Sequence, residues 1–95
     1  MRIFHVHLCD VPIIGCNFRG QLSLTREMFH FHMNIFQLLI PVDIYINCRE
    51  IADLYVCSYL HFYDAIGIRT VNGKTYKFYS PTDMRILFET MKSLL

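Results

Sequence analysis

The sequence predicts an α+β fold: a strongly bent antiparallel β-sheet, or partly open barrel, of about seven strands capped by one C-terminal α-helix. Three observations predict it. Much of the chain alternates apolar and polar residues with the period of a strand. An Asn72-Gly73 pair separates two such runs, as in a β-hairpin. The last segment, from Met84 to Leu95, instead repeats its apolar residues at helical spacing.

Residues 3–8 form the first predicted strand. One face carries apolar residues and the other carries His5 and His7, so the strand has one wet or partnered face. The apolar side chains are Phe4, Val6 and Leu8. Residues 9–19 include Asp, Pro, Gly and Asn, which favours an irregular connection or a broken edge strand.

A second hairpin is predicted over residues 20–32. Strands over 20–25 and 28–32 flank a tight turn at 25–27. The predicted apolar faces of these strands are formed by Leu22, Leu24, Phe29 and Phe31. Opposite the phenylalanines, His30 and His32 lie on the other face of the second strand.

The middle of the chain carries weaker signals. Residues 34–37 are expected to form a loop and residues 38–40 a short strand ended by Pro41. Residues 48–50 are expected to form a turn. The run 52–63 fits neither period cleanly, but its β-branched and aromatic residues favour a strand.

The C-terminal third gives the firmest pattern. Asn72-Gly73 favours a type I′ turn between two strands. Ser80 then predicts a helix start, because its hydroxyl can accept from the Asp83 amide and Pro81 suits the first helical position. One apolar stripe follows, made of Met84, Leu87, Phe88, Met91 and Leu94 or Leu95.

Length and composition predict a single domain over residues 1–95 with one modest core. Hydrophobic residues make up 54% of the chain and charged residues 18%, against about 25% charged in typical domains. This surplus predicts an aromatic-rich core, or an apolar surface covered by a protein, a second copy or a lipid. The formal net charge is +1 and the basic residues are scattered, so we expect no nucleic-acid partner.

Cysteine usage and the N-terminus predict a cytoplasmic protein. The four cysteines form no Cys-x-x-Cys pair, and two histidines interrupt the first apolar run, which is wrong for a signal peptide. No apolar run approaches the roughly 20 residues that a membrane-spanning helix needs. We therefore expect reduced thiols and a cytoplasmic location, with the cytosolic face of a membrane as the alternative.

Four stretches occur in a characteristic order before the predicted helix. They are Gly20-Gln21-Leu22-Ser23-Leu24-Thr25, Phe29-His30-Phe31, Ile40-Pro41-Val42-Asp43-Ile44, and the run from Ile66 through Asn72-Gly73 to Phe78. Their order and spacing resemble the GRAM domain of the pleckstrin-homology-like (PH-like) superfold, which carries a Gly-x-Leu-x-Leu-Thr strand, an aromatic-rich partner strand and an Ile-Pro turn. The resemblance runs from about Gly20 to Leu95.

This resemblance implies a bent seven-stranded sheet capped at one end by the helix. It also implies a module that is not an enzyme, binds phosphoinositides or other anionic lipids, or docks proteins. The residues agree. Cys9 follows His7 on the same strand face, but nothing marks an oxyanion hole or a third catalytic group, and no nucleophile motif occurs. We therefore expect no catalytic residues and no cofactor.

Three binding hypotheses follow. The first is docking of another protein or of a second copy, with an aromatic surface formed by Tyr55, Tyr59, Phe62 and Tyr63. The second is weak recruitment to anionic membrane lipid through Arg19, Arg26, Lys74 and Lys77. The third is metal binding by His5, His7, His30 and His32, which would converge if their two strands paired. Each set also has an ordinary alternative. The aromatic residues can fill the core, the basic residues can be solvated charges, and the histidines can be exposed polar residues of a sheet face.

Overall fold

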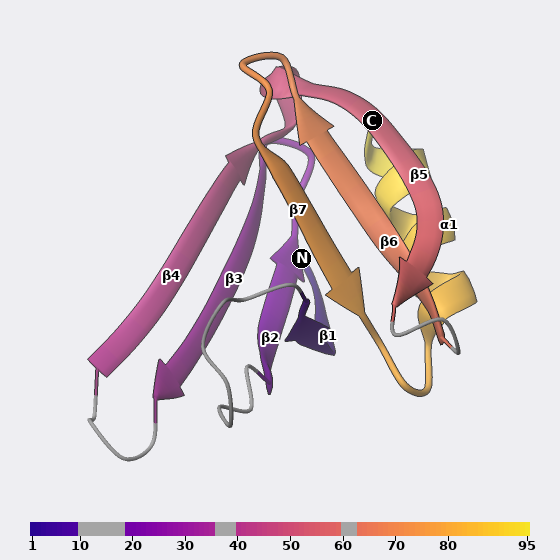
Figure 1. Cartoon of the computed structure of the whole chain (residues 1–95). Helices are drawn as coiled ribbons and strands as arrows, with labels where there is room; N and C mark the ends of the chain where they lie inside the picture. The colour runs from indigo at the N-terminus through magenta and orange to yellow at the C-terminus, as the bar shows by residue number, and fades with distance from the viewer. Residues whose placement is uncertain (10–18, 36–39, 60–62) are drawn as a thin grey trace.

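The computed structural model describes residues 1–9, 19–35, 40–59 and 63–95, which form seven strands, one short 3₁₀-helix and one α-helix (Figure 1). The elements are β1 (Arg2–Leu8), β2 (Arg19–Leu24), β3 (Met28–Ile35), β4 (Ile40–Asn47), η1 (Cys48–Glu50), β5 (Ile51–Tyr59), β6 (Tyr63–Thr70), β7 (Thr75–Tyr79) and α1 (Met84–Leu94).

The strands form one antiparallel sheet in the order β4-β3-β2-β1-β7-β6-β5. The sheet curls into a half-barrel, with β4 to β1 as one part and β7 to β5 as the other, and α1 lies beside β5 and β6 (Figure 1). The predicted curled antiparallel sheet with one C-terminal helix is therefore confirmed.

The core fills the inside of this curl. It collects the apolar faces of the strands and the buried side of α1. Phe31 and Phe78 bring the two parts of the sheet together, with ring centroids 5.5 Å apart. From α1, Leu87 and Met91 are fully buried, and partly buried Phe88 packs beside them. The predicted apolar stripe of the helix is confirmed, and its burial holds α1 against the sheet.

The strands expected over residues 3–8, 20–25 and 28–32 are confirmed as β1, β2 and β3. Two predictions in the middle of the chain are wrong. The predicted loop begins at Asn34, but Asn34 belongs to β3 and pairs with Pro41, which lies inside β4 rather than ending a strand. Pro41 fits there because β4 is an edge strand, where a missing N–H can face away from the neighbouring strand. The predictions for residues 36–39 lie outside the described residues.

The strand expected over residues 52–63 is confirmed for residues 52–59, which belong to β5. Its predicted end is wrong, because Tyr63 already begins β6, and residues 60–62 lie outside the described residues. Both strands are rich in β-branched and aromatic residues, so composition alone does not separate one from the other. The turn expected at 48–50 is the 3₁₀-helix η1, capped by the Asn47 side chain, which accepts from the Arg49 N–H.

The β6–β7 hairpin is confirmed, but its turn is longer than the predicted type I′ turn. The Thr70 carbonyl accepts from the Gly73 N–H at 3.0 Å, and the Thr70 N–H donates to the Lys74 carbonyl at 2.9 Å. Gly73 has φ 87°, the left-handed conformation that ends a three-residue hairpin loop. The Thr70 hydroxyl also donates to the Asn72 side chain and accepts from the Lys74 N–H, which braces this longer loop.

The α-helix starts later than predicted. The Ser80 hydroxyl does accept from the Asp83 N–H, at 3.3 Å. This bond closes a turn over residues 81–83 rather than the first turn of the helix. Asp83 has φ −131° and ψ 32°, outside the helical region, so the regular helix begins at Met84 and not at Pro81.

Candidate functional site

An apolar groove lies between α1 and the strands β5 and β6. Its volume is about 280 Å³. Ile66, from β6, is fully buried at the groove, whereas Val56, from β5, is 56% exposed. Met84 and Phe88 complete the apolar lining from the helix, and charged residues complete the rest of it. The charged lining residues are Asp64, Arg85 and Glu89.

The groove borders an edge of the sheet. β5 is the last strand in the sheet order and pairs with β6 on one side. In the described part of the chain, no strand pairs with its other side. The register pairs Val56 with Ile66, so these two side chains share the face of the sheet that α1 covers. The groove is therefore next to a backbone edge that none of the described strands pairs with.

Tyr55 and Tyr63, the predicted interface residues whose side chains are described, lie on the opposite face of these strands, which we call the outer face. The Tyr55 ring lies over Gly67 on this face. Tyr63 is 47% exposed and its ring centroid lies 5.0 Å from that of Tyr79. The Tyr59 side chain and Phe62 lie outside what the structure describes. The groove residues Val56 and Phe88 were missed, because the sequence does not fix which face of β5 meets the helix.

The predicted basic residues divide between different parts of the sheet. Arg19 begins β2 and Arg26 lies in the turn after it, about 20 Å away for a strand of this length. Lys77 lies within β7, and its ammonium donates to the Ser58 carbonyl at 3.3 Å. Lys74 follows the β6–β7 turn and is exposed. Arg19 and Lys77 therefore do not join Arg26.

Arg26 and Lys74 do lie at the same end of the sheet. Backbone bonds connect the β2–β3 turn to η1, through Cys48 N–H and the Glu27 carbonyl, at 3.0 Å. They also connect η1 to the β6–β7 turn, through Val71 N–H and the Glu50 carbonyl, at 2.8 Å. Arg49, in η1, lines a recess of about 320 Å³ with Arg26.

The four histidines do not form one group. β2 lies between β1 and β3, so the two histidine-bearing strands do not pair and their backbones are about 10 Å apart. His5 is opposite Gln21, which in turn is opposite His32. The condition for convergence of all four imidazoles, direct pairing of their strands, is therefore not met.

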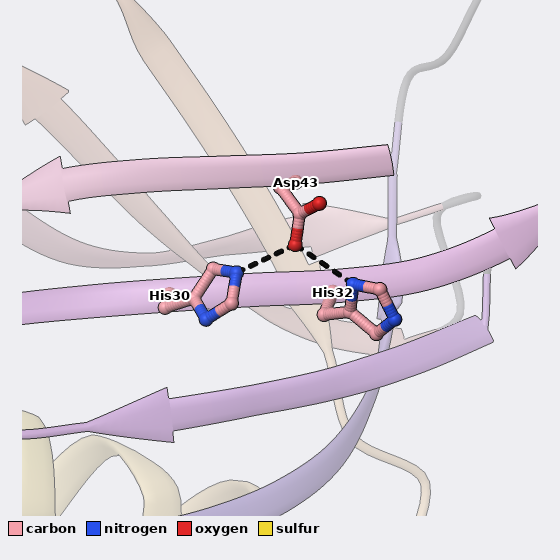
Figure 2. A group of neighbouring side chains, drawn as sticks. All are labelled: His30, His32 and Asp43. Atoms are coloured by element: carbon pink, nitrogen blue, oxygen red, sulfur yellow. Dashed lines mark hydrogen bonds and ion pairs between the residues drawn. The ribbon is translucent and has the colours of Figure 1, made fainter. Parts of the chain in front are cut away.

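His30 and His32 instead converge on Asp43, from β4 (Figure 2). One carboxylate oxygen, Oδ1, accepts from His30 Nε2 and from His32 Nδ1, each at 2.7 Å. The β3–β4 register causes this arrangement, because it places Asp43 directly opposite His32 and Tyr45 opposite His30. The Tyr45 ring stacks on His30, with centroids 4.3 Å apart and planes 4° from parallel.

The two histidines also act on the charge of Asp43. Their hydrogen bonds, His30 first and His32 second, lower the pKa of the Asp43 carboxyl below its ordinary value, because they favour the ionised form. The side chains of His30, His32 and Asp43 are 31%, 43% and 33% exposed. Solvent can therefore reach this cluster. The sequence did not predict Asp43 as its centre, because the position of Asp43 beside the two histidines depends on the β3–β4 register.

The described cysteines are unbridged. Cys9 is buried, and Cys48 and Cys57 are half-buried. The Cys48 thiol donates to the Thr25 carbonyl at 3.5 Å. Burial, and then the charge of Glu27, raise the pKa of this thiol, which makes it a poor nucleophile.

Comparison with known proteins yields a similarity of fold. No protein-family model and no curated protein matches the chain. Its structure is similar to the crystal structure of the C-terminal domain of an unknown protein from Leishmania infantum, with a TM-score of 0.79 over 99% of this chain and 81% of that chain. No helix in the described residues is long and apolar enough to cross a membrane. Since the sequence identity is 16%, the comparison shows a shared curled antiparallel sheet with a C-terminal helix.

Proposed function

We propose that this chain is a PH/GRAM-like, non-catalytic docking module that binds an extended segment of another protein along the edge of β5. The observation that carries the proposal is the apolar groove between β5, β6 and α1, which borders this edge. The order of seven antiparallel strands and a closing helix, together with the motifs of residues 20–44, supports the PH/GRAM-like part of the proposal.

An edge strand offers main-chain donors and acceptors to an incoming strand. Main-chain pairing supplies affinity, and pockets for alternate side chains of the added strand supply specificity. At β5 the edge for main-chain pairing and the pocket for a side chain are adjacent, because Val56 belongs to the edge strand and also lines the groove. An extended partner segment can pair with β5 and place an apolar side chain against Ile66 and Phe88.

The groove is small. Pockets for drug-sized ligands usually measure about 300–1,000 Å³, and this groove, at about 280 Å³, lies at the bottom of that range, which suits one apolar side chain of a peptide. Its charges add a preference. Asp64 and Glu89 carry two negative charges at the groove, against one positive charge on Arg85. A basic residue beside the apolar anchor of the partner therefore fits best.

A displayed library of random peptides of about 6–10 residues, the length of one strand, tests the proposal directly. We expect selected peptides to share an apolar anchor and to shift amide NMR signals of β5 and α1. Val56→Arg should weaken their binding at least about tenfold, because it places a charge beside the anchor. The matched control is Ile86→Arg, on the exposed side of α1 and 51% exposed in the wild type, which should leave binding unchanged.

Peptides that bind elsewhere, or that bind equally well to Val56→Arg, contradict the docking site. So does selection that yields no binding peptide. A second copy of the chain is the other possible occupant of the groove, and sedimentation of the free chain at several concentrations tests it. Self-association that Val56→Arg abolishes would identify a second copy, rather than another protein, as the partner.

Anionic lipid is the second candidate ligand, and one observation favours it: Arg26, Arg49 and Lys74 lie at the same end of the sheet. Glu27 and Glu50 lie there too, so the net positive charge of this end is small. Co-sedimentation with phosphatidylserine vesicles at low salt tests this candidate. Binding lost in Arg26→Gln/Lys74→Gln and kept in Arg19→Gln supports it, and absence of co-sedimentation removes it.

A further inference from the structure

The cluster of His30, His32 and Asp43 has the donor set of a transition-metal site. Two imidazole nitrogens are directed at one carboxylate oxygen, and the three atoms lie within 4.8 Å of one another (Figure 2). In the described residues, this is the only such group of three or more histidine, cysteine or acidic side chains. It is separate from the groove beside β5, because β4 and β5 are opposite edges of the sheet.

To hold an ion, the cluster must open around the carboxylate and bring the two imidazole nitrogens closer, because the three ligand atoms now span up to 4.8 Å. Ligand atoms about 2.0–2.1 Å from a tetrahedral ion are about 3.3 Å from one another. The two nitrogens now lie 2.7 Å from the Asp43 oxygen, as hydrogen-bond donors. Replacing the shared protons with an ion therefore requires the carboxylate to move outward by about 0.6 Å from each imidazole. It also requires the two imidazoles to rotate toward each other, because their nitrogens are now up to 4.8 Å apart. The exposure of all three side chains allows these rotations.

The surroundings hold the ligands in place. The stacked ring of Tyr45 fixes the plane of His30. Direct cross-strand pairing fixes the separation of His32 and Asp43. A site built on two neighbouring strands is more precisely positioned than a site on loops. The ion would link the edge strand β4 to β3 and would keep one coordination position open to solvent.

The donor chemistry selects the class of ion. Imidazole suits Zn²⁺, Cu²⁺ and Ni²⁺, whereas Mg²⁺ and Ca²⁺ require mainly oxygen ligands. Catalytic zinc sites have three protein ligands and an open fourth position, whereas structural zinc sites have four protein ligands. We infer that His30, His32 and Asp43 form a binding site for one divalent transition-metal ion, with Zn²⁺ as the ion that its three-ligand geometry fits.

Metal titration of the whole chain tests the site. Calorimetry with Zn²⁺ should give one ion per chain, and Co²⁺ should add the visible absorption of a tetrahedral centre. His30→Gln, His32→Gln and Asp43→Asn should each lower the affinity by at least about tenfold, since even outer-shell changes at metal sites cost 10–100-fold. Mg²⁺ should not compete.

The matched controls are His5→Gln and His7→Gln, which remove imidazoles from the same outer face without touching the cluster. Their zinc affinity should equal that of the wild type. Circular dichroism should show every variant folded, because all the changed side chains are at least partly exposed. The inference is overturned if Zn²⁺ does not bind. It is equally overturned if the three cluster variants bind as the wild type does, or if His5→Gln and His7→Gln lose as much affinity as the cluster variants.

Discussion

Tyr55 covers Gly67, its partner across the β5–β6 pair. A Cβ atom placed on Gly67 would lie 2.2 Å from Tyr55 Cε2 and 2.3 Å from Cζ, so the ring occupies the space that any side chain would need. Gly67 is buried although it faces outward, because this ring shields its backbone from water. The contact explains why an aromatic residue and a glycine occur at these two positions.

The first prediction concerns this pair. Gly67→Ala should destabilise the fold by about 1–3 kcal/mol, because the methyl group displaces the Tyr55 ring. Urea unfolding of Gly67→Ala, Tyr55→Ala and the double variant measures the coupling. In the Tyr55→Ala background the cost of Gly67→Ala should shrink, and an unchanged cost would show that the ring is not its cause.

The second prediction concerns α1. Leu87→Ala should cost about 2–5 kcal/mol, because Leu87 is fully buried against the sheet and its loss leaves a cavity. Ile86→Ala, at the adjacent and 51% exposed position of the same helix, should change stability by no more than about 0.5 kcal/mol. Urea unfolding compares the two. Equal costs would mean that the helix does not pack as described.

The third prediction concerns the turn before β7. Gly73 has φ 87°, and no atom lies within 4 Å of the position that a methyl group would take there, so only the backbone conformation resists substitution. Gly73→Ala should cost about 1–2 kcal/mol. Gly73→Asn should cost less, because asparagine tolerates the left-handed region better than alanine does. Thermal melting of both variants checks the order, and a reversed order would contradict it.

The fourth prediction concerns Cys48. Because burial and Glu27 raise its pKa, alkylation of Cys48 by iodoacetamide should reach half its maximal rate at a higher pH than that of a free thiol. Peptide mass spectrometry separates it from the other cysteines. The proton is held more tightly in the folded state, so the stability that this thiol contributes is fully present below its unfolded pKa and is lost as pH rises through the folded pKa.

Glu27→Gln provides the comparison for Cys48. Removing the negative charge should move the alkylation midpoint to lower pH, whereas Glu89→Gln, on α1, should leave it in place. If the alkylation midpoint is the same in Glu27→Gln as in the wild type, burial alone would account for the raised pKa of Cys48.

The sequence predicted those parts of the fold that depend on local pattern. Period-two alternation located β1, β2 and β3, and the helical stripe located α1, because each pattern reports one element alone. It did not separate β5 from β6, because both strands share one composition. It also misplaced Pro41, because edge position in a sheet is a property of the whole fold.

The candidate sites depended still more on tertiary structure. His30 and His32 were recognisable as a pair on one strand face, but their partner Asp43 follows only from the β3–β4 register. The groove could be predicted only by knowing that α1 lies on the face of β5 that carries Val56, rather than on the face that carries Tyr55. Arg26 and Lys74 share an end of the sheet only because η1 bonds to both turns.

The short β1–β7 pairing has a consequence for the order in which the chain folds. In the described residues, the strand pairing between the two parts of the sheet is His7 with Tyr79 and Leu8 with Phe78, extended by the Cys9 N–H, which donates to the Lys77 carbonyl at 2.8 Å. Strands β1 to β4 can assemble from successive local hairpins, and so can β5 to β7, whereas this seam joins distant ends of the sequence. Because distant contacts cost the most chain entropy to close, we expect two locally formed meanders to dock late, with the seam as the final closure.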